Sequence, residues 1–290
     1  MTLSYFLFLA SYCIINVGEF IFAKIEGGNM ERKAVFFDID GTLYNHKIGV
    51  PESARHGIKE LKANGHLAFI STGRARAMVP QELVDLGFDG VLAACGAYVE
   101  YEGNVVYNID LEREMADNVV KILQNHKVFC ILEGQNNLYM DEYEFLDEGE
   151  FSVNRFKNLY GKMIKPITGE EHNINKITCR MDKRSNFEEA YKFLEKDFDC
   201  IRHNSTIVEL VQKGFSKVKG IEEIIKHLGI DINDTYAFGD SANDIDMLKY
   251  VKYGIAMGNS SSEILEMVKY KTDNIENDGI YKGLKQFKLI

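Results

Sequence analysis

Two carboxylates, Asp38 and Asp40, stand two residues apart directly after a short apolar run at 34–37. An apolar run of this length predicts a fully buried strand. Side chains just past the end of a strand can turn toward one crevice, and open α/β sheets bind ligands outside the carboxyl ends of their strands. Gly41 allows the tight turn that follows. The four fixed residues of D-x-D-G-T would occur by chance about once in 10⁵ windows, so the pattern is specific.

A hydroxyl and a glycine follow the next apolar run, at 67–70. Thr72 offers an O–H group, and Gly73 offers a backbone N–H that no side chain obstructs. Both suit a phosphate oxygen. A plain turn is the alternative for this short motif. Arg74 could hold phosphate in a bidentate manner or could be an ordinary surface residue.

A third group of polar side chains closes the apolar run at 235–238. Asp240, Asn243 and Asp244 fall within five residues. Their oxygens suit a hard cation, whereas an Asx-rich turn with a helix cap is the alternative. Lys217 precedes the helix before this run, and on its own it indicates only a surface charge.

The elements that must position these residues alternate between strands and helices. Strands are predicted at 34–37, 67–70, 90–93, 235–238 and 254–256, and helices at 51–64, 79–86, 220–228, 245–249 and 263–268. This alternation predicts a parallel sheet covered by helices on both faces.

A different pattern interrupts the alternation. A hairpin is predicted at 98–107, and an α+β stretch follows, with helices at 115–124 and 187–196 and strands at 128–132, 176–181 and 200–203. The predicted fold class is therefore α/β, a doubly wound, Rossmann-like core with an inserted α+β cap. We assign residues 30–107 and 205–290 to the core and residues 108–204 to the cap. The acidic run at 141–150 is interpreted as a solvated face.

Composition and net charge exclude several classes of protein. The 290 residues are 46% apolar and 27% charged, as in globular proteins rather than disordered or polytopic membrane proteins. The formal net charge of -10 argues against a generic nucleic-acid partner. The five cysteines are scattered, which favours reduced thiols and a cytoplasmic location.

The first 29 residues allow three hypotheses. Residues 3–23 are strongly apolar, and the first basic residue is Lys24. A membrane anchor and a secretory signal are two interpretations. We favour the third, in which Met30 is the physiological start and residues 1–29 are a non-native leader. In that case no stable membrane association is expected.

The polar motifs, in this order, resemble the haloacid dehalogenase superfamily of phosphohydrolases, in its Cof-type branch with an α+β (C2B-like) cap. D-I-D-G-T-L at 38–43 looks like the first motif of that family, Thr72 like the second, Lys217 like the third and G-D-S-A-N-D at 239–244 like the fourth. Cys95-Gly96-Ala97 stands where this branch usually has N-G-A.

The resemblance implies a mechanism for the acidic residues. Asp38 would be the nucleophile that forms an aspartyl phosphate, and Asp40 the general acid and base. Mg²⁺ would be bound by the Asp38 carboxylate, the Asp40 carbonyl and Asp240, and Asp244 would orient Lys217 or a metal-bound water. The groups implied to hold the phosphoryl oxygens are the N–H groups of Ile39 and Gly73 and the side chains of Thr72, Lys217 and Asn243.

The function implied is a Mg²⁺-dependent phosphatase, a phosphoric monoester hydrolase, that acts on small phosphorylated metabolites, and we expect sugar phosphates. A phosphomutase and a catalytically silent, sugar-phosphate-binding regulator are the alternatives. The cap would close over the site and bind the leaving group. Five residues could contact a polar substrate there, although each is also a typical surface residue: His172, Lys176, Arg180, Arg202 and His203.

Overall fold

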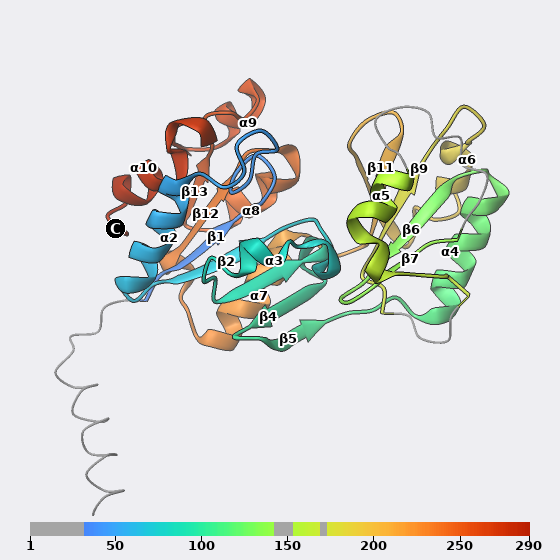
Figure 1. Ribbon diagram of the computed structural model, residues 1–290, viewed down its shortest axis with the longest axis horizontal. Coiled ribbons are helices and arrows are strands. Elements are labelled where there is room, and N and C mark those ends of the chain that lie inside the picture. Colours follow the sequence, from blue (N-terminus) through green and yellow to red (C-terminus); the bar gives the residue numbers. More distant parts are fainter. Residues whose placement is uncertain (1–31, 142–152, 169–172) are drawn as a thin grey trace, which may run out of the picture. The chain divides into compact units, whose positions relative to one another are not determined.

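Figure 1 shows the computed structural model of the chain, which describes residues 32–141, 153–168 and 173–290. The hypotheses about residues 1–29, most of the acidic run at 141–150 and His172 fall outside these ranges. Residues 33–290 form one unit that contains an eight-stranded and a six-stranded sheet. Within the described ranges, no helix is long and apolar enough to cross a membrane.

The larger sheet has the strand order β14-β13-β12-β1-β2-β3-β4-β5. Its first six strands in this order are parallel. These are β1 (Ala34–Phe37), β2 (Leu67–Ser71), β3 (Gly90–Ala93), β12 (Thr235–Gly239), β13 (Tyr253–Ala256) and β14 (Tyr270–Lys271). At the other edge, β4 (Tyr98–Tyr101) and β5 (Asn104–Asn108) form the predicted antiparallel hairpin.

Strand β1 has no exposed residue because helices cover both faces of this sheet (Figure 1). Val35 and Phe37 pack on the face covered by α2 (Glu52–Ala63) and α10 (Gly279–Gln286), and Ala34 and Phe36 pack on the other face. The helices of that second face are α7 (Lys217–Leu228), α8 (Ile245–Tyr250) and α9 (Ser262–Met267). The predicted α/β fold with a doubly wound parallel core is confirmed.

The smaller sheet has the order β10-β11-β9-β6-β7-β8 and its own apolar core. Its strands are β6 (Phe129–Glu133), β7 (Leu138–Tyr139), β8 (Ile164–Lys165), β9 (Lys176–Arg180), β10 (Phe198–Arg202) and β11 (Ile207–Gln212). Helix α4 (Arg113–Asn125) contributes Val119 and Leu123 to that core. Strand β11 pairs with β9 and β10, so residues 207–212 belong to this sheet rather than to the core segment that we expected to begin at 205.

Two predicted helices are shorter than expected. The segment 79–86 is helical only in the four-residue helix α3 (Gln81–Val84), which follows a 3₁₀ turn, η1 (Arg76–Met78). Pro80 restricts the backbone before it, so α3 can begin only after Pro80. The segment 187–196 is helical only in α6 (Phe187–Tyr191). Beyond it, the Phe193 N–H bonds the carbonyl of Ala190, a tighter i→i+3 pattern that turns the chain toward β10.

Candidate active site

The ends of β1 and β12 bring the predicted carboxylates together. The Asp38 N–H donates to the Phe238 carbonyl at 3.0 Å, so the segments that follow β1 and β12 lie side by side. Asp38, Asp240 and Asp244 each offer a carboxylate oxygen, and these oxygens lie within 4.8 Å of one another. Because β1 and β12 pair in parallel, residues about 200 positions apart in the sequence lie at one edge of the sheet.

Gly41 permits the close approach of the first loop to Asp240. Its φ is +87°, and a Cβ atom at this position would lie 2.2 Å from Asp240 Oδ2. Any other residue would therefore be strained by its backbone and would displace the Asp240 carboxylate. The neighbouring Thr42 hydroxyl donates to Asp240 Oδ1 at 3.0 Å, which fixes the orientation of that carboxylate.

Lys217 is the first residue of α7 and is only 3% exposed. Its Nζ donates to Asp38 Oδ1 at 2.5 Å and to Asp244 Oδ1 at 2.6 Å. The other oxygen of Asp244, Oδ2, accepts the N–H groups of Asp240 and Ser241, each at 3.0 Å. Asp244 is fully buried and both of its oxygens have partners. It therefore anchors Lys217 and the end of β12 rather than offering a free oxygen.

A second turn, η2 (Ala94–Gly96), positions Lys217, and its role was not evident from the sequence. Gly96 has a φ of +84°, and a Cβ atom there would lie 2.2 Å from the Ser216 carbonyl. The turn therefore packs directly against the first residue before α7. Cys95 also has a positive φ, +53°, and its N–H donates to the Thr72 carbonyl at 3.3 Å. The C-G-A motif links Thr72 with Lys217.

The carboxylates repel one another. Burial raises the pKa of Asp38 to about 8, with a further contribution from Asp244, although Lys217 acts in the opposite direction. Burial and Asp244 also raise the pKa of Asp240 to about 6. Burial lowers the pKa of Lys217, but Asp244 and Asp38 outweigh it and raise the pKa above its usual value. The cluster holds more negative charge than one lysine offsets.

Arg74 contacts the second predicted catalytic carboxylate. Its Nε donates to Asp40 Oδ2 at 2.8 Å and its Nη2 to Asp40 Oδ1 at 2.5 Å. The Asp40 side chain is 47% exposed, in contrast to Asp38. The Arg74 side chain is only 20% exposed and lines the same cavity as Asp38, so it is not an ordinary surface residue, and its contact with phosphate stays a prediction. The arginine orients Asp40 through a bidentate pair.

Three further predicted residues, Thr72, Gly73 and Asn243, line one cavity. A cavity of about 330 Å³ is lined by Asp38, Asp40, Thr72, Gly73, Arg74, His203, Glu209, Ser241 and Asn243. The Thr72 hydroxyl accepts the Arg74 N–H at 3.1 Å, and the Ser241 hydroxyl donates to the Asn243 amide oxygen at 2.5 Å. Ile39 is fully buried, so only its backbone can reach a ligand.

Strands of the smaller sheet also reach this cavity. Lys176 on β9 is 2% exposed, and its Nζ donates to the Gly73 carbonyl at 2.7 Å. The same Nζ lies 2.8 Å from Glu209 Oε1 and 3.3 Å from Glu133 Oε2. His203 Nε2 lies 3.3 Å from Glu209 Oε1. Glu209 was not predicted, because a single glutamate in an unrecognised strand carries no sequence signal.

The cap candidates from the sequence have different positions. Lys176 is a buried residue and not a surface residue, and His203 lines the cavity. Arg202 instead pairs with Glu188 at 2.5 Å and lies over the Phe187 ring. Arg180 is half-buried at the end of β9 and does not line the cavity.

The acidic cluster fits a hard divalent cation. Within the described ranges, no hydrogen bond uses Oδ2 of Asp240, since Thr42 contacts only its Oδ1 atom, and Asp38 Oδ1 accepts only from Lys217 and keeps a second lone pair. Carboxylate oxygens are the ligands that such cations prefer. The raised pKa values of both groups show that the cluster would be stabilised by additional positive charge. Asp244, with both oxygens bonded, does not fit as a direct ligand.

Comparisons with known proteins agree with this geometry. The sequence model of the haloacid dehalogenase-like hydrolases matches residues 35–284. YkrA of Bacillus subtilis (strain 168), which is named as a phosphatase, is 32% identical over 264 residues, which cover 90% of this chain and all of YkrA. A crystal structure of a hypothetical protein from Geobacillus kaustophilus HTA426 superposes with a TM-score of 0.76 at 32% identity and covers 89% of this chain and all of that one.

A second solved structure is that of BT4131, described as a subclass IIB sugar phosphatase of the same superfamily. It is 29% identical, with a TM-score of 0.72, and covers 89% of this chain and all of its own. The family match over most of the chain, the related phosphatases and the cluster at the ends of β1 and β12 lead to one conclusion. The chain belongs to the haloacid dehalogenase-like hydrolases and is a phosphatase of that family.

Proposed function

We propose that the protein hydrolyses phosphate monoesters of small hydroxylated metabolites, sugar phosphates among them, with Mg²⁺ and through a phosphorylated Asp38. The observation that carries the proposal is the buried Lys217 Nζ, which lies between Asp38 and Asp244. Beside it, Oδ2 of Asp240 makes no hydrogen bond within the described residues. The likeness to BT4131, a sugar phosphatase, supports the substrate class.

The chain supplies a nucleophile with one free oxygen. Lys217 holds Oδ1 of Asp38, which leaves Oδ2 to attack phosphorus. In this step a bond forms between Oδ2 and phosphorus, and the bond between phosphorus and the ester oxygen breaks. Thr72, the Asn243 amide and the N–H groups of Ile39 and Gly73 would hold the phosphoryl oxygens as charge moves among them.

Asp40 would transfer the protons. Its half-exposed carboxyl group would protonate the departing ester oxygen, and Arg74 would hold it in position. A water molecule would then attack the phosphorus of the acyl phosphate and give a proton to Asp40, which restores free Asp38 and releases inorganic phosphate. Both half-reactions therefore balance without a further reactant.

Asp38, Asp240 and the Asp40 carbonyl would hold the Mg²⁺ ion. When bound, the ion supplies positive charge that offsets the repulsion between an anionic nucleophile and an anionic substrate. Asp244 would keep Lys217 and the N–H groups of Asp240 and Ser241 in place.

The test is the release of inorganic phosphate from p-nitrophenyl phosphate in the presence of Mg²⁺. We expect turnover by the wild type and none above background by Asp38→Asn. A phosphomutase would instead isomerise a sugar phosphate without release of phosphate. If the wild type and Asp38→Asn are equally inactive while both bind phosphate, the binding-only alternative replaces this proposal.

A further inference from the structure

The turn after β13 contacts the first loop, residues 38–51 after β1, across the end of β12. The sheet order places β12 between β13 and β1, so the segments after β13 and β1 are two strands apart. The Asn259 side chain bridges them, since its Nδ2 donates to the Gly41 carbonyl at 2.9 Å. Asn259 lies in a turn in which the Ser260 N–H donates to the Met257 carbonyl at 3.0 Å. The mechanism proposed above gives this contact no role.

The other end of the Asn259 amide is also held. Its Oδ1 accepts the N–H of Ile275 at 3.0 Å. Since a carbonyl group only accepts and an N–H group only donates, the reversed amide would lose both bonds. Ile275 is buried and packs in the apolar cluster that also contains Ile39 and Leu43. The amide is therefore anchored to an apolar core that includes residues of the first loop.

Gly258 allows the turn to approach the segment that holds Ile275. A Cβ atom at position 258 would lie 2.5 Å from Asn274 Oδ1 and 2.8 Å from the Asn274 backbone nitrogen. The Gly258 N–H donates to the Asp273 carbonyl at 3.1 Å. A larger residue would push the turn away from this segment and would separate Asn259 from its partners.

Gly41 joins two groups that act at the candidate metal site. The peptide before it contains the Asp40 carbonyl, and the N–H of this peptide is bonded within the first loop. The peptide after it leads to Thr42, whose hydroxyl orients Asp240. Asn259 holds the carbonyl of this second peptide, so the backbone is fixed on both sides of Gly41. Because glycine is conformationally permissive, these bonds keep the positive φ that brings Gly41 against Asp240.

We propose that Asn259 is a positioning residue for the Mg²⁺ site, because it holds the first loop against Asp240 and so keeps the Asp40 carbonyl and the Asp240 carboxylate in place before the ion binds. The inference rests on the Mg²⁺ site of the proposed function. Asn259 acts through the Gly41 carbonyl and is not itself a ligand of the ion. Groups ordered in advance bind more tightly, since less freedom is lost on binding.

Calorimetric titration with Mg²⁺ tests the inference without turnover. Asn259→Ala should raise the Kd for Mg²⁺ by about fivefold or more, because the loss of a group that orients metal ligands weakens metal binding. Asn45→Ala is the matched control, since the Asn45 amide contacts Glu276 at 3.5 Å and ties the same loop to the same segment farther from Gly41. It should leave the Kd within about twofold. An unchanged Kd in Asn259→Ala, or an equal rise in both variants, would overturn the assignment.

Asn259→Asp separates the two bonds of the amide. A carboxylate can still accept the Ile275 N–H but cannot donate to the Gly41 carbonyl. In about 0.5 M KCl, which screens the added surface charge, the Kd for Mg²⁺ should be about fivefold or more above that of the wild type in the same salt. A Kd equal to that of the wild type would show that Asn259 only supports its own turn, and the inference would be wrong.

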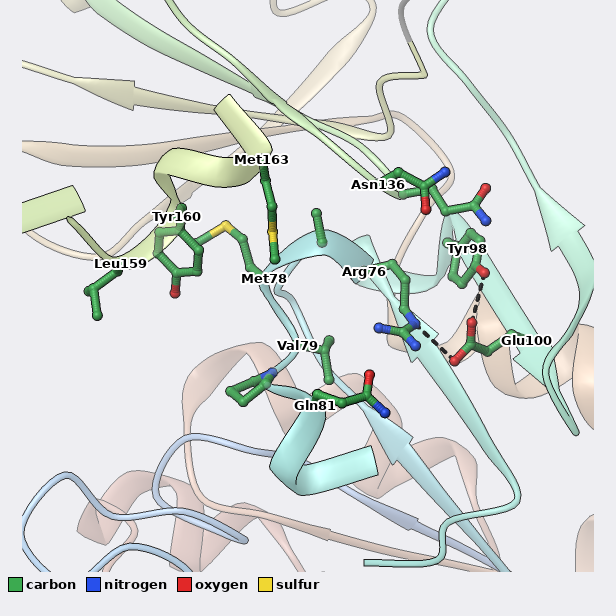
Figure 2. Close-up of a pocket in the computed structure, with 13 residues that line it drawn as sticks. Arg76, Met78, Val79, Gln81, Tyr98, Glu100, Asn136, Leu159, Tyr160 and Met163 are labelled. Atoms are coloured by element: carbon green, nitrogen blue, oxygen red, sulfur yellow. Dashed lines mark hydrogen bonds and ion pairs between the residues drawn. The ribbon is translucent and has the colours of Figure 1, made fainter. Parts of the chain in front are cut away.

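Kinetics provide a second readout. Asn259 lines neither the catalytic cavity nor the cavity shown in Figure 2, so its substitution removes no side chain from either. With p-nitrophenyl phosphate, Asn259→Ala should need about fivefold more Mg²⁺ for half-maximal rate, while kcat and KM at saturating Mg²⁺ stay within about twofold of the wild type. A loss of kcat that saturating Mg²⁺ does not restore would contradict a role confined to the metal site.

These measurements separate the inference from the proposed function. If the wild type binds Mg²⁺ but releases phosphate from no ester, the proposed function fails, and the calorimetric comparison by itself supports or overturns the inference. If the wild type releases phosphate and Asn259→Ala binds Mg²⁺ as tightly as the wild type, only the inference fails. If the wild type binds no Mg²⁺, both are wrong.

Discussion

Two lysines are buried among the residues that the structure describes, one in each sheet region, and each lies between two carboxylates. Lys217 bonds Asp38 and Asp244, and Lys176 lies between Glu209 and Glu133. Both have a raised pKa, because the carboxylates outweigh the burial that lowers it. They differ in what lies next to them.

The Lys217 cluster has an unbalanced charge. Asp240 adds a third carboxylate there, and the pKa values of Asp38 and Asp240 rise to about 8 and about 6. The Lys176 cluster is more nearly balanced, because Lys176 and, to a lesser extent, the hydrogen bond with His203 lower the pKa of Glu209 to about 2, although burial acts to raise it. An unbalanced buried cluster is typical of a site that receives a cation and a reactant, and a balanced one is typical of a structural contact.

The largest expected effect is on the two carboxylates that we propose as catalytic, Asp38 and Asp40. Asp38→Asn and Asp40→Asn should each lower kcat by at least about 10³, because each removes a covalent or proton-transfer role. The melting temperature of Asp38→Asn should not fall, since the change relieves repulsion with Asp244 and Asp240. Asp246→Asn, an exposed carboxylate on α8, is the control and should retain full activity.

Removal of the metal should affect turnover through the Lys217 cluster and not through the Lys176 cluster. Chelation should lower turnover by at least about 10², and Mg²⁺ should restore it and raise the melting temperature, because a ligand of the native state stabilises that state. Asp240→Asn should require about tenfold more Mg²⁺ for half-maximal activity. Glu209→Gln should leave the Mg²⁺ requirement unchanged. Full turnover after exhaustive chelation would contradict the assignment of the acidic cluster.

Substitution of the lysines compares the clusters directly. Lys217→Met should lower kcat by about 10² or more, because Lys217 holds the nucleophile. Lys176→Met should lower the free energy of unfolding by about 3–5 kcal/mol and leave kcat within about tenfold, since it exposes two buried carboxylates to each other. Addition of Glu133→Gln should recover part of that stability. A loss of kcat in Lys176→Met equal to that in Lys217→Met would show that the Lys176 cluster is not merely structural.

The smallest expected effect is on acid stability. The folded state lowers the pKa of Glu209 from 4.5 to about 2, so its contribution is complete above pH 4.5 and is lost as the pH falls toward 2. The free energy of unfolding, measured with denaturant at several pH values, should therefore fall less steeply in Glu209→Gln than in the wild type over this interval. Identical slopes would indicate that Glu209 is not paired in solution.

Much of the geometry of the candidate site could be predicted because its residues follow strands. Asp38 and Asp240 each come directly after a buried apolar run, and parallel pairing brings such positions to one edge. Lys217 could be assigned only through the family resemblance, since a lysine before a helix has no signal of its own. The structure adds its burial and both of its carboxylate partners.

Other features could not be predicted for physical reasons. Strand β11 has the largely apolar sequence IVELVQ, which could equally belong to the core, so its place in the smaller sheet depends on pairing with β9 and β10. Glu209 reaches the catalytic cavity only because of that pairing. The contact of Arg74 with Asp40 depends on a side-chain orientation that spacing does not encode.

The sequence by itself determined the parallel core, the family, and the carboxylates that the strands deliver to one edge, because these depend on local periodicity and short motifs. Only the tertiary structure decided which lysine faces an unbalanced cluster, which arginine holds Asp40, and that Glu209 lines the cavity beside Asp38. Those features arise where segments far apart in the chain meet. Their energies depend on burial and on the distance between charges, which no local pattern specifies.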